Sequence, residues 1–179
     1  MKVYSFIKQG IELVPVEVEV SLLPGLPQFQ LMGLPDTMIK ESQLRIKSAL
    51  QLQGFSIPTT QQVLIHLKPA YINKSSRGLD LAIAYAFLLE TEQIKPDERF
   101  SDKVYAYGEL SLDGKVTMPD DLDSLMCLGE DEALLSGPVH HLVDYPIFSV
   151  SELKDLDRPQ WSPVSQTQFK FERPKVPEI

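Results

Sequence analysis

Two pairs of charged residues have a type and spacing that could bind an anion or contact a neighbouring subunit. Lys74 and Arg77 lie just before the helix predicted over residues 79–90, and a helix start with nearby cations could hold an anion or a phosphate. An exposed loop without a ligand is the alternative interpretation. Glu41 and Arg45 are four residues apart on another predicted helix, a spacing that allows an ion pair. That pair could tie the chain to a neighbouring subunit, or it could be a plain surface pair.

The remaining candidate ligands do not predict a metal site. His140 and His141 are adjacent in a predicted loop, where neighbouring side chains usually point apart and are solvated. His66 lies on a predicted strand and is more simply interpreted as a polar residue with satisfied hydrogen bonds. The acidic residues that follow the predicted hairpin suit a solvated helix start better than a cation site; they are Asp120, Asp121 and Asp123.

The elements that must position these residues alternate between strands and helices. Apolar residues that recur at every second position predict strands, and a spacing of three to four predicts helices. Asp36 is expected to cap the first helix, and Asp113-Gly114 to close a hairpin between residues 103–110 and 115–118. The other predicted strands cover 3–9, 11–23, 28–34, 61–67, 132–136 and 147–149, and the helices 37–53, 79–90, 120–128, 138–143 and 151–156. The pattern predicts an α+β fold.

Composition narrows the classes of function. The chain has 179 residues and a net charge of −8, and residues 119–157 alone hold one basic and ten acidic residues. This is not the basic surface of a protein that binds nucleic acid by itself. The single cysteine, Cys127, excludes an internal disulfide framework. No apolar run reaches the roughly 20 residues of a membrane span, so we expect a cytoplasmic protein with no membrane partner.

Several motifs in a fixed order resemble the start of the ComM/YifB family, AAA+ ATPases related to the ATPase subunit of magnesium chelatase. The resemblance covers about residues 1–118. The stretches that carry it are Leu26-Pro27, Leu31-Met32-Gly33-Leu34-Pro35-Asp36, Lys40-Glu41, Arg45-Ile46-Lys47-Ser48-Ala49-Leu50, Gly54-Phe55, Val63-Leu64-Ile65-His66-Leu67-Lys68-Pro69-Ala70, Asp80-Leu81-Ala82-Ile83-Ala84 and Gly108-Glu109-Leu110-Ser111-Leu112-Asp113-Gly114. After Val116 the sequence departs from the family pattern, so the acidic segment is particular to this chain.

The resemblance implies a fold like that of the Lon protease domain, a mixed sheet packed by two main helices with a short α/β C-terminal part. That domain would span residues 1–157, followed by a linker or tail over 158–179. In the family an ATPase module follows this domain. The phosphate-binding motif G-x-x-x-x-G-K-[ST] does not occur in this sequence, so we predict no cofactor in this chain, and ATP with magnesium only if such a module follows.

The resemblance also implies that the Lon peptidase chemistry is lost. Lon enzymes use a serine nucleophile and a lysine that takes its proton. Laid on the Lon pattern, the nucleophile position is Gly78 and the lysine position is Asp123. Ser75 or Ser76 could replace the nucleophile only with a shifted backbone and another base.

We therefore predict a non-catalytic domain that serves oligomer assembly and engages a partner or DNA in natural transformation and recombination. Self-association or an AAA+ module is the expected partner, and DNA is expected only through the full assembly. The alternatives are a stand-alone protein-binding adaptor that uses the acidic segment, and a degenerate serine peptidase. Edge strands and two loops are the expected contact surfaces, with the candidate residues Gly33, Pro35, Asp36, Glu41, Arg45, Lys74 and Arg77.

Overall fold

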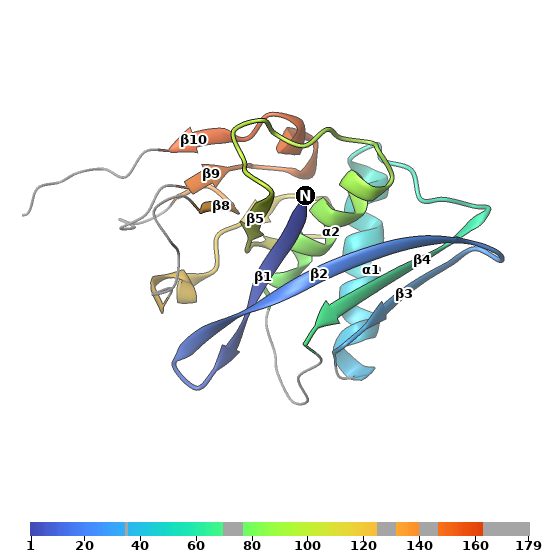
Figure 1. Cartoon of the computed structure of the whole chain (residues 1–179), viewed down its shortest axis with the longest axis horizontal. Helices are drawn as coiled ribbons and strands as arrows, with labels where there is room; N and C mark the ends of the chain where they lie inside the picture. Colours follow the sequence, from blue (N-terminus) through green and yellow to red (C-terminus); the bar gives the residue numbers. More distant parts are fainter. Residues whose placement is uncertain (35, 70–76, 125–131, 140–146, 163–179) are drawn as a thin grey trace, which may run out of the picture.

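The computed structural model describes residues 1–34, 36–69, 77–124, 132–139 and 147–162. These residues form one large sheet with two helices on one of its faces (Figure 1). The elements in chain order are β1 (Lys2–Gln9), β2 (Glu12–Pro24), β3 (Gln28–Met32), α1 (Asp36–Leu52), β4 (Gln61–Lys68), α2 (Leu79–Glu90), β5 (Lys103–Ala106), β6 (Glu109–Leu110), β7 (Val116–Thr117), the 3₁₀ helix η1 (Asp120–Ser124), β8 (Ala133–Ser136), β9 (Ile147–Ser149), the 3₁₀ helix η2 (Leu153–Asp157) and β10 (Gln160–Ser162).

The sheet is mixed and has eight strands in the order β10-β9-β8-β5-β1-β2-β4-β3. β2 pairs antiparallel with β1 and β4. β3 precedes α1 in the chain, and after this crossover β4 runs parallel to β3. On the other side β5, β8 and β9 continue parallel from β1, and β10 closes the sheet antiparallel to β9. The predicted α+β class with a mixed sheet and two main helices is confirmed.

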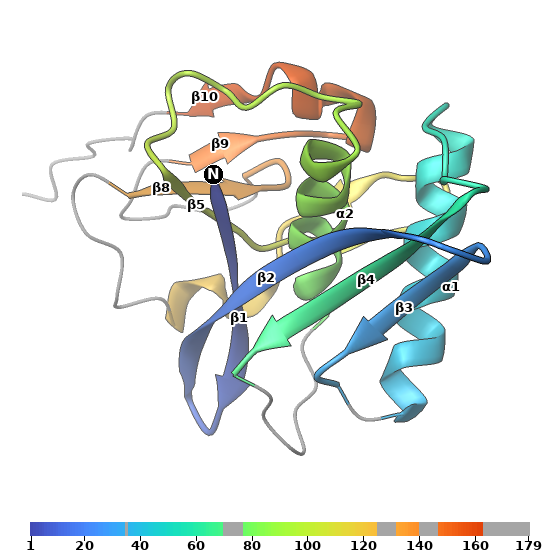
Figure 2. The ribbon, with the colours of Figure 1, turned by 45° about the vertical axis from the view of Figure 1, so that its right-hand side comes forward.

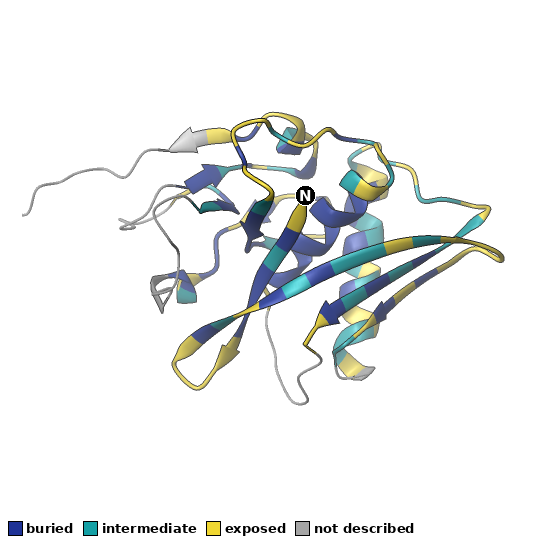
Figure 3. Cartoon of the chain, viewed as in Figure 1, coloured by how far each residue is buried: buried dark blue, intermediate teal, exposed yellow. Residues whose placement is uncertain are grey.

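Helix α2 is the centre of the core. Its residues from Leu79 to Leu88 are all buried, as its nearly continuous apolar sequence predicted. It packs on β1, β2 and β5, and α1 lies beside it over β3 (Figure 2). The burial colouring shows α2 almost wholly covered, whereas the tip of the β1–β2 hairpin is exposed (Figure 3).

The opposite face of the sheet carries a second, smaller apolar cluster. Phe6 stacks on Tyr105 with ring centroids 5.1 Å apart and meets Tyr107 edge-on at 5.8 Å. Met118 and Leu122, just before and within η1, belong to the same cluster, so β1 and β5 carry buried apolar side chains on both faces of the sheet. The cluster consists of Phe6, Leu13, Tyr105, Tyr107, Met118, Leu122, Leu134 and Ile147.

The predicted hairpin between residues 103–110 and 115–118 is only partly correct. The first strand is split, because β5 joins the large sheet while β6 pairs antiparallel with β7 in a separate two-stranded sheet. The chain leaves β5 to meet the start of α2, where the amide of Gly108 donates to the carbonyl of Gly78 and the amide of Leu81 donates to the carbonyl of Gly108. These bonds to the helix replace those of a continuous strand.

Other boundaries also differ from the prediction. Helix α1 begins at Asp36 itself, so this residue lies in the first turn instead of capping the helix from outside. Within the described residues the helices expected over 120–128 and 151–156 are the short 3₁₀ helices η1 and η2. Residues 138 and 139 are not helical, and the rest of the helix expected over 138–143 lies outside the described residues.

The sheet continues past residue 157, where the sequence predicted the domain to end. β10 pairs with β9 through Gln160 and Ser149, Trp161 and Phe148, and Ser162 and Ile147. The remainder of the expected tail, from residue 163 to residue 179, lies outside the described residues. No helix in the described part of the chain combines the length and the apolar character needed to cross a membrane.

Candidate functional site at the start of helix α2

The backbone around the start of α2 is held by three segments that are distant in the sequence. The amide of Tyr107 donates to the carbonyl of Leu135 on β8 at 2.9 Å. The next amide, that of Gly108, donates to the carbonyl of Gly78 at 2.9 Å, directly before α2. These bonds fix the segment after β5 between the sheet and the helix start.

Gly78, which the sequence resemblance predicts at the position of the Lon nucleophile, has no room for a side chain. A Cβ atom built on Gly78 would lie 2.6 Å from Cζ of Tyr107, and closer still to two other ring atoms. The Tyr107 side chain is buried, and its hydroxyl donates to the carboxylate of Asp121, 3.0 Å from Oδ1 and 3.1 Å from Oδ2. A buried aromatic ring, anchored at its far end, therefore fills the space that a nucleophile would need.

A hollow of about 370 Å³ opens beside this ring. Lys8 and Arg77 contribute positive charge to its wall, and three acidic residues contribute negative charge. Its described lining contains no serine, threonine or cysteine, so it offers no hydroxyl or thiol nucleophile. The residues that line it are Lys8, Arg77, Gly78, Tyr107, Glu109, Pro119, Asp120 and Asp121.

A buried ion pair joins α1 to α2 next to the same helix start. Arg45 Nε on α1 lies 2.6 Å from Asp80 Oδ2 in the first turn of α2, and the Asp80 side chain is only 1% exposed. Burial raises the pKa of Asp80, and the hydrogen bond and charge of Arg45 oppose that rise. The hydrogen bond to Asp80 in turn raises the pKa of Arg45. Asp80 Oδ1 has no hydrogen-bond partner among the described residues.

The ion pair expected between Glu41 and Arg45 is a wrong prediction. Arg45 turns inward to Asp80 and lies 3.4 Å from the Ser42 hydroxyl through Nη2, while Glu41 is exposed one turn earlier. Glu41 adds only a longer-range attraction that contributes to the raised pKa of Arg45. The buried carboxylate takes the guanidinium because its own burial would otherwise be uncompensated.

Gly33 has a structural role at the end of β3. Its φ angle is +98°, and a Cβ atom there would lie 2.8 Å from the carbonyl oxygen of Leu67 on β4. Glycine at this position therefore allows the backbone to pass close to β4 where the chain leaves β3 and turns towards α1. Asp36 begins α1, and Pro35 lies outside the described residues.

The second expected loop is described only at its end. Arg77 is exposed and lines the same hollow as Asp121, and Lys8 of β1 is a second cation in its described lining. Lys74, Ser75 and Ser76 lie outside the described residues, as do Cys127 and the histidines at 140 and 141, and the side chain of Asp123 is likewise not described.

Two residues of this site were missed in the sequence analysis. Asp80 is the one charged residue inside the apolar run from Leu79 to Leu89, and that contrast could have marked it as a buried partner of a cation. No local pattern marks Tyr107, because its contact with Gly78 depends on where two distant segments meet. Within the described part of the chain no three side chains of histidine, cysteine, aspartate or glutamate gather as a metal site.

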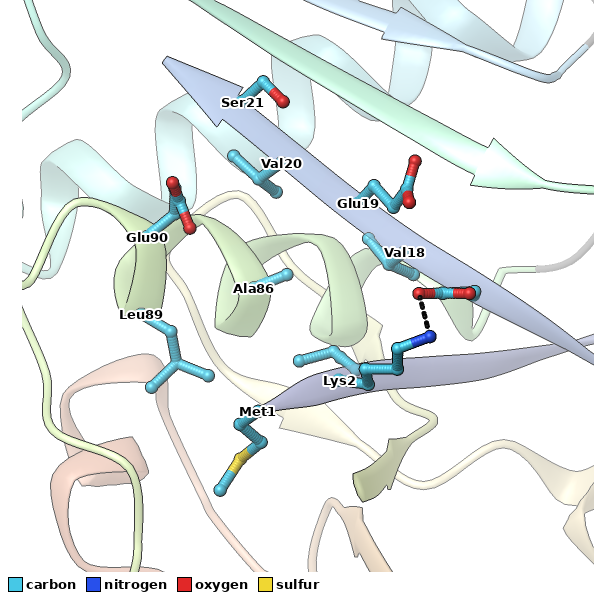
Figure 4. Close-up of a pocket in the computed structure, with 11 residues that line it drawn as sticks. Met1, Lys2, Val18, Glu19, Val20, Ser21, Ala86, Leu89 and Glu90 are labelled. Carbon is cyan, nitrogen blue, oxygen red and sulfur yellow. Dashed lines mark ion pairs between the residues drawn. The ribbon is translucent and has the colours of Figure 1, made fainter. Parts of the chain in front are cut away.

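A second hollow, of about 300 Å³, lies between β2 and the last turns of α2 (Figure 4). Its floor is apolar, with Val18 and Val20 facing Ala86 and Leu89. Its rim carries the ion pair between Lys2 Nζ and Glu17 Oε1, 3.3 Å apart, which spans β1 and β2. Nothing in this lining resembles a catalytic arrangement.

Comparison with known proteins places this chain in a family. The family profile "Subunit ChlI of Mg-chelatase" matches residues 16–132. YifB of Escherichia coli (strain K12) is 36% identical over 105 residues, which are 59% of this chain and 20% of YifB. A protein of Mycobacterium tuberculosis (strain ATCC 25618 / H37Rv) is 37% identical over 115 residues, 64% of this chain and 22% of that protein.

The competence protein ComM of Haemophilus influenzae is 34% identical over 114 residues, again 64% of this chain and 22% of ComM. The chain therefore belongs to the magnesium-chelatase-related ComM/YifB family, and it corresponds to the N-terminal domain of these proteins. The matched region spans about a fifth of the length of these relatives.

Proposed function

We propose that this domain is non-catalytic, has a Lon-like fold, and serves oligomer assembly and partner or DNA engagement in a ComM/YifB-type protein. The observation that carries the proposal is the contact between Gly78 and Tyr107. In a Lon-type peptidase this position holds the nucleophile, whereas here a buried ring excludes any side chain. The domain then acts by binding, and no bond is made or broken in it.

The charges around the former nucleophile position support the same conclusion. The lysine position of the Lon pair corresponds to Asp123, and a carboxylate cannot supply a neutral amine that takes a proton from serine. Lys8 is the amine that lines the described hollow, and it is exposed.

Exposed apolar side chains support a role in assembly. Leu44 and Leu52 on the outer side of α1 are 69% and 68% exposed, and Leu112 is 59% exposed. The Ser48 hydroxyl, between the two leucines in the sequence, donates to the carbonyl of Leu112 at 2.9 Å. Grouped apolar residues on a surface are typical of sites that contact another protein.

Engagement of DNA is proposed only for the assembled protein. The net charge of −8 gives the isolated chain no attraction for phosphate. The name of the Haemophilus relative links that protein to competence. The domain holds the neighbouring subunits in position, and another part of the assembly supplies the positive charge that binds the DNA phosphates.

Light scattering on the purified chain, coupled to gel filtration, tests the assembly role. We expect a mass above 20.2 kDa that increases with concentration. A mass of 20.2 kDa at every concentration, together with failure of a ComM/YifB-type ATPase module to bind the chain, would contradict the proposal. Anisotropy of a labelled DNA duplex is the companion measurement, and the isolated chain is expected to bind it weakly.

A stand-alone adaptor is the second candidate, and one observation favours it. Residues 119–157 carry a net charge of −9, and the described part of this segment includes acidic residues in η1 and η2. Such a surface attracts a basic partner through charge, and that attraction weakens with salt. Partner binding that does not change between low and high salt would argue against this segment as the contact.

A further inference from the structure

Strand β3 is the outermost strand of the large sheet, next to β4 (Figure 2). Its pairing with β4 is parallel and runs from Gln28 opposite Gln62 to Met32 opposite His66. Among the described residues no strand pairs with its other side. In such a strand about half of the backbone amides and carbonyls point away from the sheet and can pair with another strand.

This edge lacks the features that usually prevent pairing between molecules. Residues 20–34 contain no charged residue, although the chain has 17 basic and 25 acidic residues. β3 itself contains no proline, and its register with β4 is unbroken, so it has no bulge. Natural edge strands are commonly protected by charge, proline or a bulge.

The side chains of β3 suit a second strand on both faces of the sheet. Phe29 and Leu31 are buried towards the helices and would extend the apolar layer. Gln28, Gln30 and Met32 are exposed on the other face, and the Gln30 amide donates to Oε1 of Gln28 at 2.9 Å. Glutamine amides both donate and accept hydrogen bonds, so this row can pair with its own copy.

We propose that β3 pairs antiparallel with β3 of a second copy of this chain, which joins the two sheets about a two-fold axis. The inference rests on the proposed role in assembly and names its surface. A molecule with a net charge of −8 repels its own copy, and an uncharged, self-complementary edge is where two copies meet with least repulsion.

The pairing has a definite register. We expect the register that pairs all five residues of β3. Gln30, the middle residue, then lies opposite Gln30 of the other copy, and Gln28 lies opposite Met32. Residues directly opposite in an antiparallel pair have Cβ atoms about 4.5 to 5.5 Å apart. Two like charges at Gln30 would therefore be in direct contact, whereas a charge at Gln28 would face an uncharged residue.

The test uses charge variants of Gln30 in the full chain and measures the dissociation constant by sedimentation equilibrium. Gln30→Lys and Gln30→Glu are each expected to weaken self-association by about fivefold or more, because like charges oppose each other across the axis. An equimolar mixture of the two variants should associate at least as tightly as the wild type. Gln28→Lys is the matched control, with the same charge change on the same strand, and should weaken association less than Gln30→Lys.

The outcomes separate this inference from the proposed function. If the wild-type chain does not self-associate, this surface is wrong, and the assembly role fails with it only if the chain also does not bind a ComM/YifB-type ATPase module. If the wild type associates but Gln30→Lys, Gln30→Glu and their mixture all behave like the wild type, the assembly role stands and the β3 interface is wrong. Circular dichroism of each variant confirms that the chain is folded in every comparison.

Discussion

Removal of the Arg45 side chain tests the buried ion pair between the two helices. In Arg45→Ala the Asp80 carboxylate, 1% exposed, loses its partner at 2.6 Å. Its Oδ1 atom lacks a hydrogen bond among the described residues, so the Ser42 side chain is the remaining group that favours the charged carboxylate. Breaking a buried pair by removing one partner costs about 3 to 5 kcal/mol, and the 29% exposure of Arg45 places this case near 3 kcal/mol.

The loss depends on pH in a direction that follows from the raised pKa of Asp80. The folded chain holds the Asp80 proton more tightly than the unfolded chain does. The contribution of protonated Asp80 to the free energy of unfolding is therefore fully present at a pH below the ordinary carboxyl pKa of 3.8. It decreases as the pH rises through the folded-state pKa. Arg45 limits this decrease in the wild type, so Arg45→Ala should be much less destabilising in acid than at neutral pH.

Urea unfolding followed by circular dichroism, at about pH 4.5 and about pH 7.5, measures both quantities. With an m-value near 2 kcal/mol/M, the neutral-pH midpoint should fall by about 1.5 M. Replacement of the carboxylate by an amide, in Arg45→Ala with Asp80→Asn, should recover part of the loss and remove its pH dependence. Glu41→Ala, one turn earlier on α1 and exposed, is the control and should change stability by less than about 0.5 kcal/mol. A loss for Arg45→Ala that is equal at both pH values, with no recovery in the double variant, would refute the buried-charge explanation.

Three further predictions concern single positions. Gly33→Ala should lower stability by about 1 to 3 kcal/mol in thermal unfolding, because φ is +98° and Cβ would lie 2.8 Å from the Leu67 carbonyl; an unchanged melting temperature would refute this. Gly78→Ser should also destabilise the chain, by about 1 to 3 kcal/mol, because its Cβ overlaps the Tyr107 ring, and it should create no serine reactivity. Tyr107→Phe should cost about 1 to 2 kcal/mol in urea unfolding through loss of the hydrogen bond to Asp121, and a neutral effect would show that this bond does not hold the ring.

The large elements could be predicted because their patterns are local. The alternation from Val14 to Val20 predicted a strand, and the structure has β2 there. Pro15 lies in the part of β2 that pairs with β1 alone, since β4 pairs with β2 only from Glu17 onward. The apolar sequence of residues 79–90 specified α2 with both ends correct. The family resemblance, carried by motifs within residues 1–118, was confirmed by the comparisons.

The parts that failed depend on contacts between distant segments. The strand expected over 103–110 is split because the chain at Gly108 bonds to the start of α2, and no local pattern encodes that meeting. Arg45 pairs with Asp80, 35 residues later, although Glu41 is nearer in the sequence. The reason is that the buried Asp80 carboxylate needs a counter-charge, whereas Glu41 is exposed. Gly33 follows β3, Asp36 begins α1 and Arg77 precedes α2, and the role of these candidate residues in partner contacts stays a prediction.

The measurement that tests the central claim most directly is reaction of the native chain with a serine-reactive fluorophosphonate probe. We predict no labelling of the wild type, because Gly78 has no room for a side chain and the sequence resemblance predicts Asp123 at the position of the Lon lysine. Ser75 and Ser76 are the remaining hydroxyls near that position in the sequence. Labelling of the wild type that disappears in the double variant Ser75→Ala/Ser76→Ala would contradict the account and establish a degenerate hydrolase.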